Sequence, residues 1–115
     1  MAKDQIFLIA PGFADPKRDD GPFICPYCNQ IEGILASFPD LAGKVEVIRL
    51  PFARPRQPVI AAIGEAHQAL PVLILPEGET RSAAKGSANG HSFATGGEAI
   101  LATLAERHGL PVIHP

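Results

Sequence analysis

Two cysteines separated by two residues carry the clearest chemistry in this sequence. They form the segment Cys25-Pro26-Tyr27-Cys28, and the 115-residue chain holds no other cysteine. Residues three apart lie on the same face of a helix, so two thiols at this spacing can alternate between dithiol and disulfide with little backbone movement. In a chain that alternates strands and helices, this spacing is typical of thiol–disulfide redox chemistry.

The two thiols are expected to play different parts. Pro26 is typical of the first position of a helix, which places Cys25 at the helix N-terminus. Unpaired N–H groups and the positive end of the helix dipole stabilise a thiolate there. Cys25 is therefore the predicted nucleophile, and Cys28, one turn further along, the more buried resolving thiol. Tyr27 is expected to shield the sulfur or to offer a surface to a partner.

A metal site is the main alternative for this pair. A closed zinc site needs four ligands, and the four histidines show no recognisable ligand spacing (His67, His91, His108 and His114). The sequence therefore predicts no metal site within one chain. An iron–sulfur role and a non-catalytic role for the two cysteines stay open.

Length and composition predict a single domain, residues 1–115, large enough to bury a core without disulfide or metal staples. The net charge is −2 with both signs interspersed, which argues against nucleic-acid and membrane partners. Residues 6–10 form an apolar run too short for a signal peptide or a membrane span. We therefore expect a reducing cytoplasm, where a Cys25–Cys28 disulfide would be a catalytic or sensing event.

Apolar runs predict four strands, at residues 6–10, 45–50, 71–76 and 91–95, the last of them an edge strand. Apolar residues spaced by three and four predict helices over 27–38, 59–70 and 98–108. Thr95 and Glu98 have the spacing of a capping box for the last helix. Residues 77–90, rich in Gly, Ser and Ala, are expected to form a long surface loop. The predicted fold is α/β, in the order β-α-β-α-β-β-α, with a central mixed four-stranded sheet flanked by helices.

The motif and the order of elements together resemble the glutaredoxins of the thioredoxin-fold superfamily. The segment C-P-Y-C is similar to the glutaredoxin active site. Leu70-Pro71, directly before the third expected strand, matches the position of the cis-proline that faces the cysteines in that superfamily. The chain as a whole also resembles an uncharacterised bacterial family of thioredoxin-like proteins, a domain of unknown function.

This resemblance implies a thiol–disulfide oxidoreductase with Cys25 and Cys28 as catalytic residues. Its active-site shell would be Pro26, Tyr27, Leu70 and Pro71. Glutathione is the implied co-substrate, with a carboxylate held at the start of the last helix, and the candidate residues are Leu70, Gly96, Gly97 and Glu98. No cofactor is required under this interpretation.

The resemblance also leaves a second class of function open. The chain could be a non-enzymatic binding module, or could share a [2Fe–2S] cluster between two copies through Cys25. For the oxidoreductase, the expected partners are disulfide-bonded or glutathionylated proteins and small thiols. The chain is expected to be a monomer or a homodimer.

Charged positions depart from the glutaredoxin pattern. A lysine is usual shortly before the first cysteine, but here the nearest preceding cations are Lys17 and Arg18. Ala99 stands where an acidic residue usually follows the Gly-Gly pair. Arg54 and Arg56 lie in the connection after the second expected strand, where we expect solvated loop charges rather than a contact with glutathione or an acidic partner.

Overall fold

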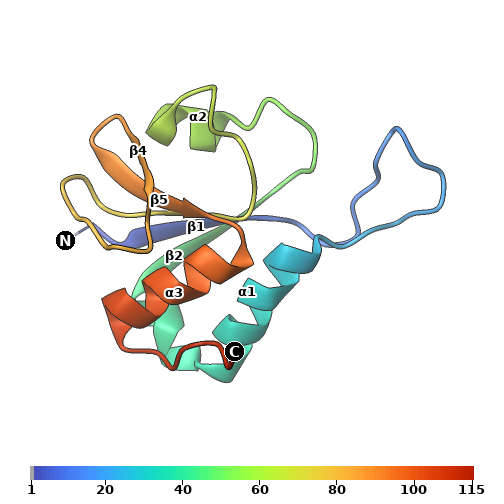
Figure 1. The fold of residues 1–115 in the computed structure, drawn as a ribbon. Coiled ribbons are helices and arrows are strands. Elements are labelled where there is room, and N and C mark those ends of the chain that lie inside the picture. The colour runs from blue at the N-terminus through green and yellow to red at the C-terminus, as the bar shows by residue number, and fades with distance from the viewer. Residues whose placement is uncertain (1) are drawn as a thin grey trace.

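A mixed sheet with helices on both faces forms the framework of the chain (Figure 1). The computed structural model describes residues 2–115. Its strands are β1 (Asp4–Ile9), β2 (Val45–Leu50), β3 (Val72–Ile74), β4 (Gly86–Ala88) and β5 (His91–Thr95). Its helices are α1 (Pro26–Ser37), α2 (Gln57–Ile63), α3 (Gly97–His108) and the short 3₁₀ helix η1 (Pro39–Gly43).

The sheet has five strands in the order β2-β1-β3-β5-β4. Strands β1 and β2 are parallel, and every other neighbouring pair is antiparallel. Ile6 lies at the centre, opposite Val47 on one side and Leu73 on the other. The apolar runs of β1 and β3 are continuous because both faces of these central strands are covered.

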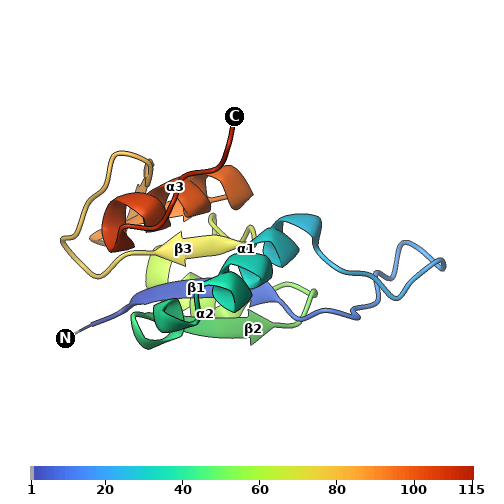
Figure 2. The ribbon, with the colours of Figure 1, turned by 90° about the horizontal axis from the view of Figure 1, so that it is seen from below.

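Helices α1 and α3 lie on one face of the sheet and α2 lies on the other (Figures 1 and 2). Alternate side chains of a strand point to opposite faces, so β1 contributes to two cores. Ile6 and Leu8 pack with residues of α1 and α3, while Phe7 packs with Val59 and Ile63 of α2. None of the helices described, α1 to α3 and η1, is long and apolar enough to span a membrane.

The prediction of four strands was wrong, because the sheet has a fifth strand inside residues 77–90. Strand β4 is short and carries no apolar run, so its sequence predicts a loop. It pairs with β5, which is therefore internal rather than an edge strand. A Cβ on Gly86 would lie within 3 Å of the Phe93 ring, so the glycine lets the two strands meet over that ring.

Two helix boundaries also differ from the prediction. Helix α2 ends at Ile63 rather than near Leu70, because Gly64 follows it with a φ of 92°, a conformation that ends the helix. The capping box expected from Thr95 and Glu98 does not form. The N-cap of α3 is Gly96, with a φ of 83° and no side-chain cap hydrogen bond.

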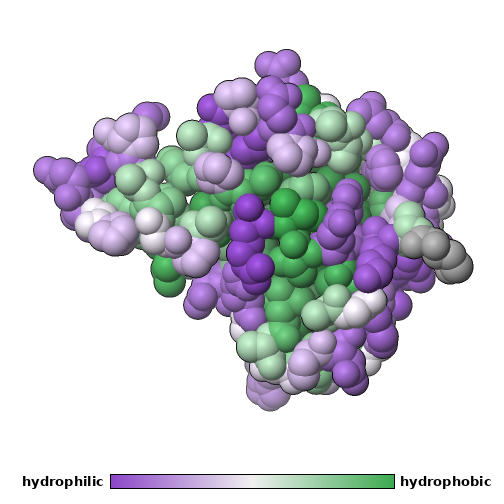
Figure 3. Space-filling model, turned by 180° about the vertical axis from the view of Figure 1, so that it is seen from behind, coloured by the Kyte–Doolittle hydropathy of each residue, from purple (hydrophilic) through white to green (hydrophobic). Residues whose placement is uncertain are grey.

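Residues 11–24 form an arm that projects from the sheet before α1 (Figure 1). At its base, Phe13 and Phe23 pair across the arm, each N–H donating to the other's carbonyl at 3.1 and 2.9 Å. Seen from behind, the far end of the arm is hydrophilic and apolar residues lie nearer the body (Figure 3). Phe13 also stacks on Phe52, with ring centroids 4.6 Å apart, which fastens the base of the arm to the segment after β2.

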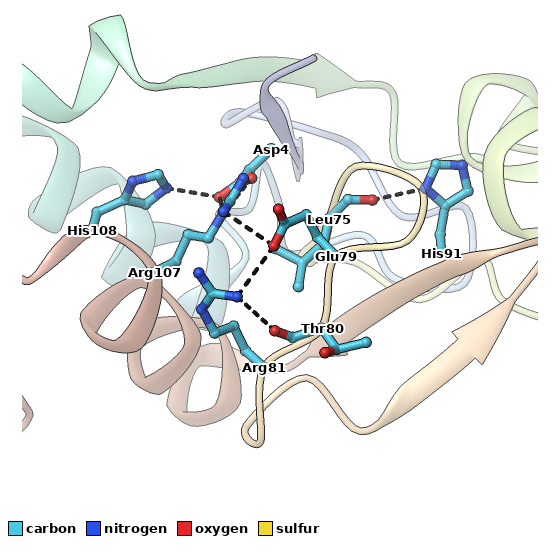
Figure 4. Close-up of polar contacts among 8 residues, drawn as sticks. All are labelled: Asp4, Leu75, Glu79, Thr80, Arg81, His91, Arg107 and His108. Carbon is cyan, nitrogen blue, oxygen red and sulfur yellow. Dashed lines mark hydrogen bonds and ion pairs between the residues drawn. The ribbon is translucent and has the colours of Figure 1, made fainter. Parts of the chain in front are cut away.

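Asp4 is the centre of a charged cluster where β1 begins (Figure 4). Its buried carboxylate accepts from Arg107 Nε at 3.1 Å and contacts His108 Nε2 at 2.7 Å. Arg107 also pairs with Glu79, which in turn pairs with Arg81. His108, at the end of α3, thus helps to join this helix to β1.

Candidate active site

Cys25 occupies the N-cap of α1, and Pro26 is the first helical residue, as the sequence predicts. Its backbone is extended, with φ −80° and ψ 118°, and Pro26 suits the next position because it has no N–H to satisfy. The Cys25 Sγ accepts the backbone N–H of Cys28 at 3.2 Å. The sulfur of Cys25 therefore receives the hydrogen bond that a capping oxygen usually accepts.

Cys28 lies one turn further along and is buried, with 3 % of its surface exposed. Burial and a side-chain hydrogen bond with Cys25 raise the pKa of the Cys28 thiol to about 12. The N–H of Ile9, 3.4 Å from Cys28 Sγ, and the charge of Arg56 act in the opposite direction. Cys28 therefore keeps its proton near neutral pH, while the half-buried Cys25 is the accessible thiol.

Two exposed side chains, Ile24 and Tyr27, lie close to Cys25 in the sequence. Ile24 and Tyr27 have 57 % and 59 % of their surfaces exposed. Both cysteines, Ile24 and Glu32 line a small hollow of about 180 Å³ between the end of β1 and the first turns of α1. The carboxylate of Glu32 is held by Arg49 Nη2 at 2.6 Å and Nε at 2.8 Å.

The other candidate residues lie on α3 and on the segments before β3 and α3, and Gly97 of α3 comes close to Tyr27. An ideal Cβ on Gly97 would lie 3.7 Å from Tyr27 Cδ1 and 2.0 Å from Gln30 Oε1, so the glycine lets α1 pack closely on the start of α3. The N–H of Gly96 donates to the carbonyl of Pro71 at 3.4 Å. The Leu70–Pro71 peptide bond is cis, as predicted, and Leu70 and Cys25 pack against the same core cluster.

A larger hollow of about 640 Å³ opens beside Tyr27. Gly96, Gly97 and Glu98 line it together with Lys85, which precedes β4. The structure thus gathers the candidate glutathione residues other than Leu70 around one opening. Lys85 was missed by sequence reasoning because it lies within the expected surface loop, where no pattern indicates that it lines this hollow.

Comparisons with known proteins give the chain a family. A family model with the description "Protein of unknown function (DUF3088)" matches residues 3–112. The chain belongs to this family. The expected relationship to a domain of unknown function is confirmed, and no match was found among curated proteins or solved structures.

Arg56 is the residue of this DUF3088 chain that sequence reasoning placed wrongly. It is not a solvated loop charge, because only 7 % of its surface is exposed. Its guanidinium donates to the carbonyls of Gln68, at 2.7 Å, and Phe52. These partners come from two irregular segments, so no local periodicity in the sequence could have revealed the burial. Arg54, its neighbour, is exposed as expected.

The described part of the DUF3088 chain offers no ready-made metal centre. Within residues 2–115, no three His, Cys, Asp or Glu side chains cluster in a way that could hold an ion. Cys25 and Cys28 are both free thiols.

Proposed function

We propose that this protein is a glutaredoxin-like thiol–disulfide oxidoreductase in which Cys25 is the nucleophile and Cys28 the resolving thiol. The observation that carries the proposal is the asymmetry of the two sulfur atoms. Cys25 is only half-buried and its Sγ accepts a backbone N–H at the start of α1, whereas Cys28 is buried and holds its proton. A dithiol of this kind has a defined attacking sulfur.

The first step exchanges one disulfide for another. The Cys25 thiolate attacks one sulfur of a substrate disulfide, forming a mixed disulfide with that sulfur and releasing the other as a thiolate. The thiolate that leaves takes up a proton from solvent. The backbone N–H of Cys28 and the N-terminus of α1 favour the negative charge on Cys25 before the attack.

The second step releases the substrate. Cys28 loses its proton and attacks Cys25 Sγ, which breaks the mixed disulfide and expels the substrate's remaining sulfur as a thiolate. The protein ends with a Cys25–Cys28 disulfide and the substrate with two thiols, so two electrons have passed to the substrate. A small thiol such as glutathione, or a protein dithiol, would reduce the disulfide again.

Features away from the motif support the glutaredoxin-like assignment. Four of the five strands have the order β2-β1-β3-β5 with only β1 and β2 parallel, which agrees with the thioredoxin-type architecture implied by the resemblance. On this proposal β4 is an addition to the edge of that sheet. The cis bond at Pro71 also agrees with it.

Glutathione is the proposed co-substrate. The hollow beside Tyr27 is lined by Gly96, Gly97 and Lys85, which offer a helix start and a cation to a carboxylate. Glu98 lines the same hollow and would repel that carboxylate, so Lys85 supplies the compensating charge. A reducing cytoplasm remains the proposed location, since it would return Cys25 and Cys28 to the dithiol.

The test uses a peptide carrying a glutathione mixed disulfide, with reduced glutathione as the electron donor. We expect wild-type protein to release glutathione from the peptide and Cys25→Ser to lose this activity. Cys28→Ser should keep it, because a single thiol can accept glutathione and be freed by a second glutathione molecule. A peptide with an internal disulfide should be reduced by wild type and poorly by Cys28→Ser.

Two results would contradict the proposal. One is wild-type activity in Cys25→Ser. The other is a folded wild-type protein whose thiols resist both oxidation and glutathionylation across glutathione buffers. Visible absorbance from a bound [2Fe–2S] cluster, lost in Cys25→Ser, would instead favour the cluster-bridging alternative.

A further inference from the structure

The guanidinium of Arg56 is a buried charge without an opposite charge beside it. Two of its nitrogens donate to backbone carbonyls, and Nε is buried with no hydrogen-bond partner. Among residues 2–115, no carboxylate lies within ion-pair distance of Arg56, although four other arginines form such pairs with acids (Arg18, Arg49, Arg81 and Arg107). An arginine keeps its charge in a protein, so a buried guanidinium is stabilised by a negative charge beside it. The described residues of the resting protein supply no carboxylate for this purpose.

Topology places Arg56 at the same edge of the sheet as the cysteines. Strands β1 and β2 are parallel, and their carboxyl ends are joined by a hydrogen bond from Ala10 N–H to the Leu50 carbonyl at 2.8 Å. The N-cap of α1, Cys25, follows the end of β1, and the N-cap of α2, Arg56, follows the end of β2. Both therefore lie beyond the same ends of two adjacent strands.

The thiols are the groups that favour the charge on this side chain. Burial lowers the pKa of Arg56 and the nearby cation Arg54 lowers it further, whereas Cys28 and Cys25 act in the opposite direction. The relation is mutual, because Arg56 in turn lowers the pKa of Cys28. The charge of the guanidinium is thus linked to both thiols, to Cys28 before Cys25.

Aromatic rings keep this region apolar. The guanidinium carbon of Arg56 lies 5.9 Å from the centroid of the Phe52 ring, and Phe13 of the arm stacks on this same Phe52 ring. Phe52, Phe13 and Cys25 pack against one core cluster, which also contains Cys28. Charges interact more strongly in such surroundings than in water.

We propose that Arg56 is a positioning residue that supplies the internal counter-charge for the Cys25 thiolate. The inference rests on the proposed function and deepens it, since it names the group that prepares Cys25 for attack. When Cys25 loses its proton, the negative thiolate balances the positive charge of Arg56. The guanidinium therefore lacks a counter-charge in the resting dithiol and gains one in the reactive thiolate. Glu32 also faces the two cysteines, but its charge is already paired with Arg49.

The test is the pH dependence of Cys25 alkylation by iodoacetamide in fully reduced full-length protein, followed by mass spectrometry. In Arg56→Gln we expect the profile to move upward by about one pH unit, or about tenfold lower reactivity at pH 7. Arg56→Lys should restore most of the reactivity because it keeps the charge. Arg54→Gln, which removes an exposed cation, is the matched control and should leave the profile unchanged.

Arg56→Met serves as the second variant, because it removes the charge but keeps an apolar side chain of similar length; the carbonyls of Gln68 and Phe52 lose their donor in Arg56→Met. A folded Arg56→Gln or Arg56→Met with the wild-type profile would overturn the proposal. Wild type gives an independent check, because a buried counter-charge is poorly screened by salt. A profile that moves by about one pH unit or more between 0.05 and 1 M KCl would also overturn it.

The alkylation experiment distinguishes a failure of the role of Arg56 from a failure of the proposed oxidoreductase activity. Alkylation reports on the Cys25 thiolate alone and needs no disulfide substrate. A shifted profile in a protein that reduces no disulfide would keep the role of Arg56 and reject the enzyme. Disulfide reduction by wild type with an unshifted profile in the Arg56 variants would reject only the present inference.

Discussion

Two buried charges lie at opposite ends of the parallel strands β1 and β2, and the protein satisfies them differently. Asp4 begins β1, is fully buried, and contacts both Arg107 and His108 (Figure 4). Arg56 follows the far end of β2 and has only backbone carbonyls as acceptors. One charge is neutralised within the fold, and the other is not.

The difference separates a structural role from a functional one. The Asp4 cluster joins β1, the segment that holds Glu79, and the end of α3, so its ion pairs hold distant parts of the chain together. A buried charge without a partner costs stability, and it is expected where a change of charge is part of the chemistry. Only the Arg56 end of the sheet contains thiols, which can gain and lose charge.

The largest expected effect is on stability at the Asp4 end. Asp4→Ala should lower the free energy of unfolding by about 3 kcal/mol, because Arg107 and His108 both lose their buried acceptor. Urea unfolding followed by circular dichroism measures the loss. The alkylation profile of Cys25 should stay at its wild-type position, since the cluster lies at the other end of β1.

Asp20→Ala is the matched control for this change, because it removes a carboxylate whose pair with Arg18 lies on the exposed arm. Equal stability of the Asp4→Ala and Asp20→Ala variants would contradict a structural role for the buried cluster. A shift of the Cys25 profile in Asp4→Ala would show that the two ends are coupled.

The next effect concerns Cys28 and alkaline pH. Its pKa is raised from 9.0 to about 12 in the folded protein, so between these values the folded state binds more protons than the unfolded state. The stability contributed by this thiol is complete below pH 9 and is lost as pH rises toward 12. From pH 8 to pH 11, the loss attributable to Cys28 should reach about 2–3 kcal/mol.

Urea unfolding of wild type and Cys28→Ala at both pH values isolates this contribution. Removing the sulfur will change stability at pH 8 for packing reasons, so the informative quantity is how much further each protein is destabilised at pH 11. An equal further loss in both proteins would mean that Cys28 does not retain its proton in the fold.

Local signals predicted the start of the cysteine helix well. Pro26 and the apolar spacing of the following residues are sufficient to place Cys25 at a helix N-cap. The cysteine spacing then predicts the thiol chemistry. Strand β4 was missed because Gly86, Ser87 and Ala88 carry no apolar pattern. Its pairing depends on Phe93, whose ring occupies the space that a side chain at Gly86 would need.

The charged groups could not be placed from the sequence, because their partners are far away along the chain. Asp4 and His108 are separated by 104 positions, and the partner of Arg56, Gln68, lies 12 positions further along, beyond helix α2. A pattern of charges along one element gives no information on such contacts. The sequence therefore predicts the thiols themselves but not the group that acts on them.

The smallest effect is expected for Glu32. It tests whether the exposed Glu32–Arg49 pair or the buried guanidinium of Arg56 controls formation of the Cys25 thiolate. Glu32 lines the same hollow as Cys25 and Cys28, but Arg49 neutralises its carboxylate through two hydrogen bonds. Because the Arg49 side chain is about half exposed, Glu32→Gln should cost less than about 1 kcal/mol in urea unfolding. Solvent and salt screen the released cation, so the Cys25 alkylation profile should move by less than about 0.3 pH unit. A shift as large as that of Arg56→Gln would instead assign control of the thiolate to the surface pair, because an exposed charge would then act as strongly as a buried one.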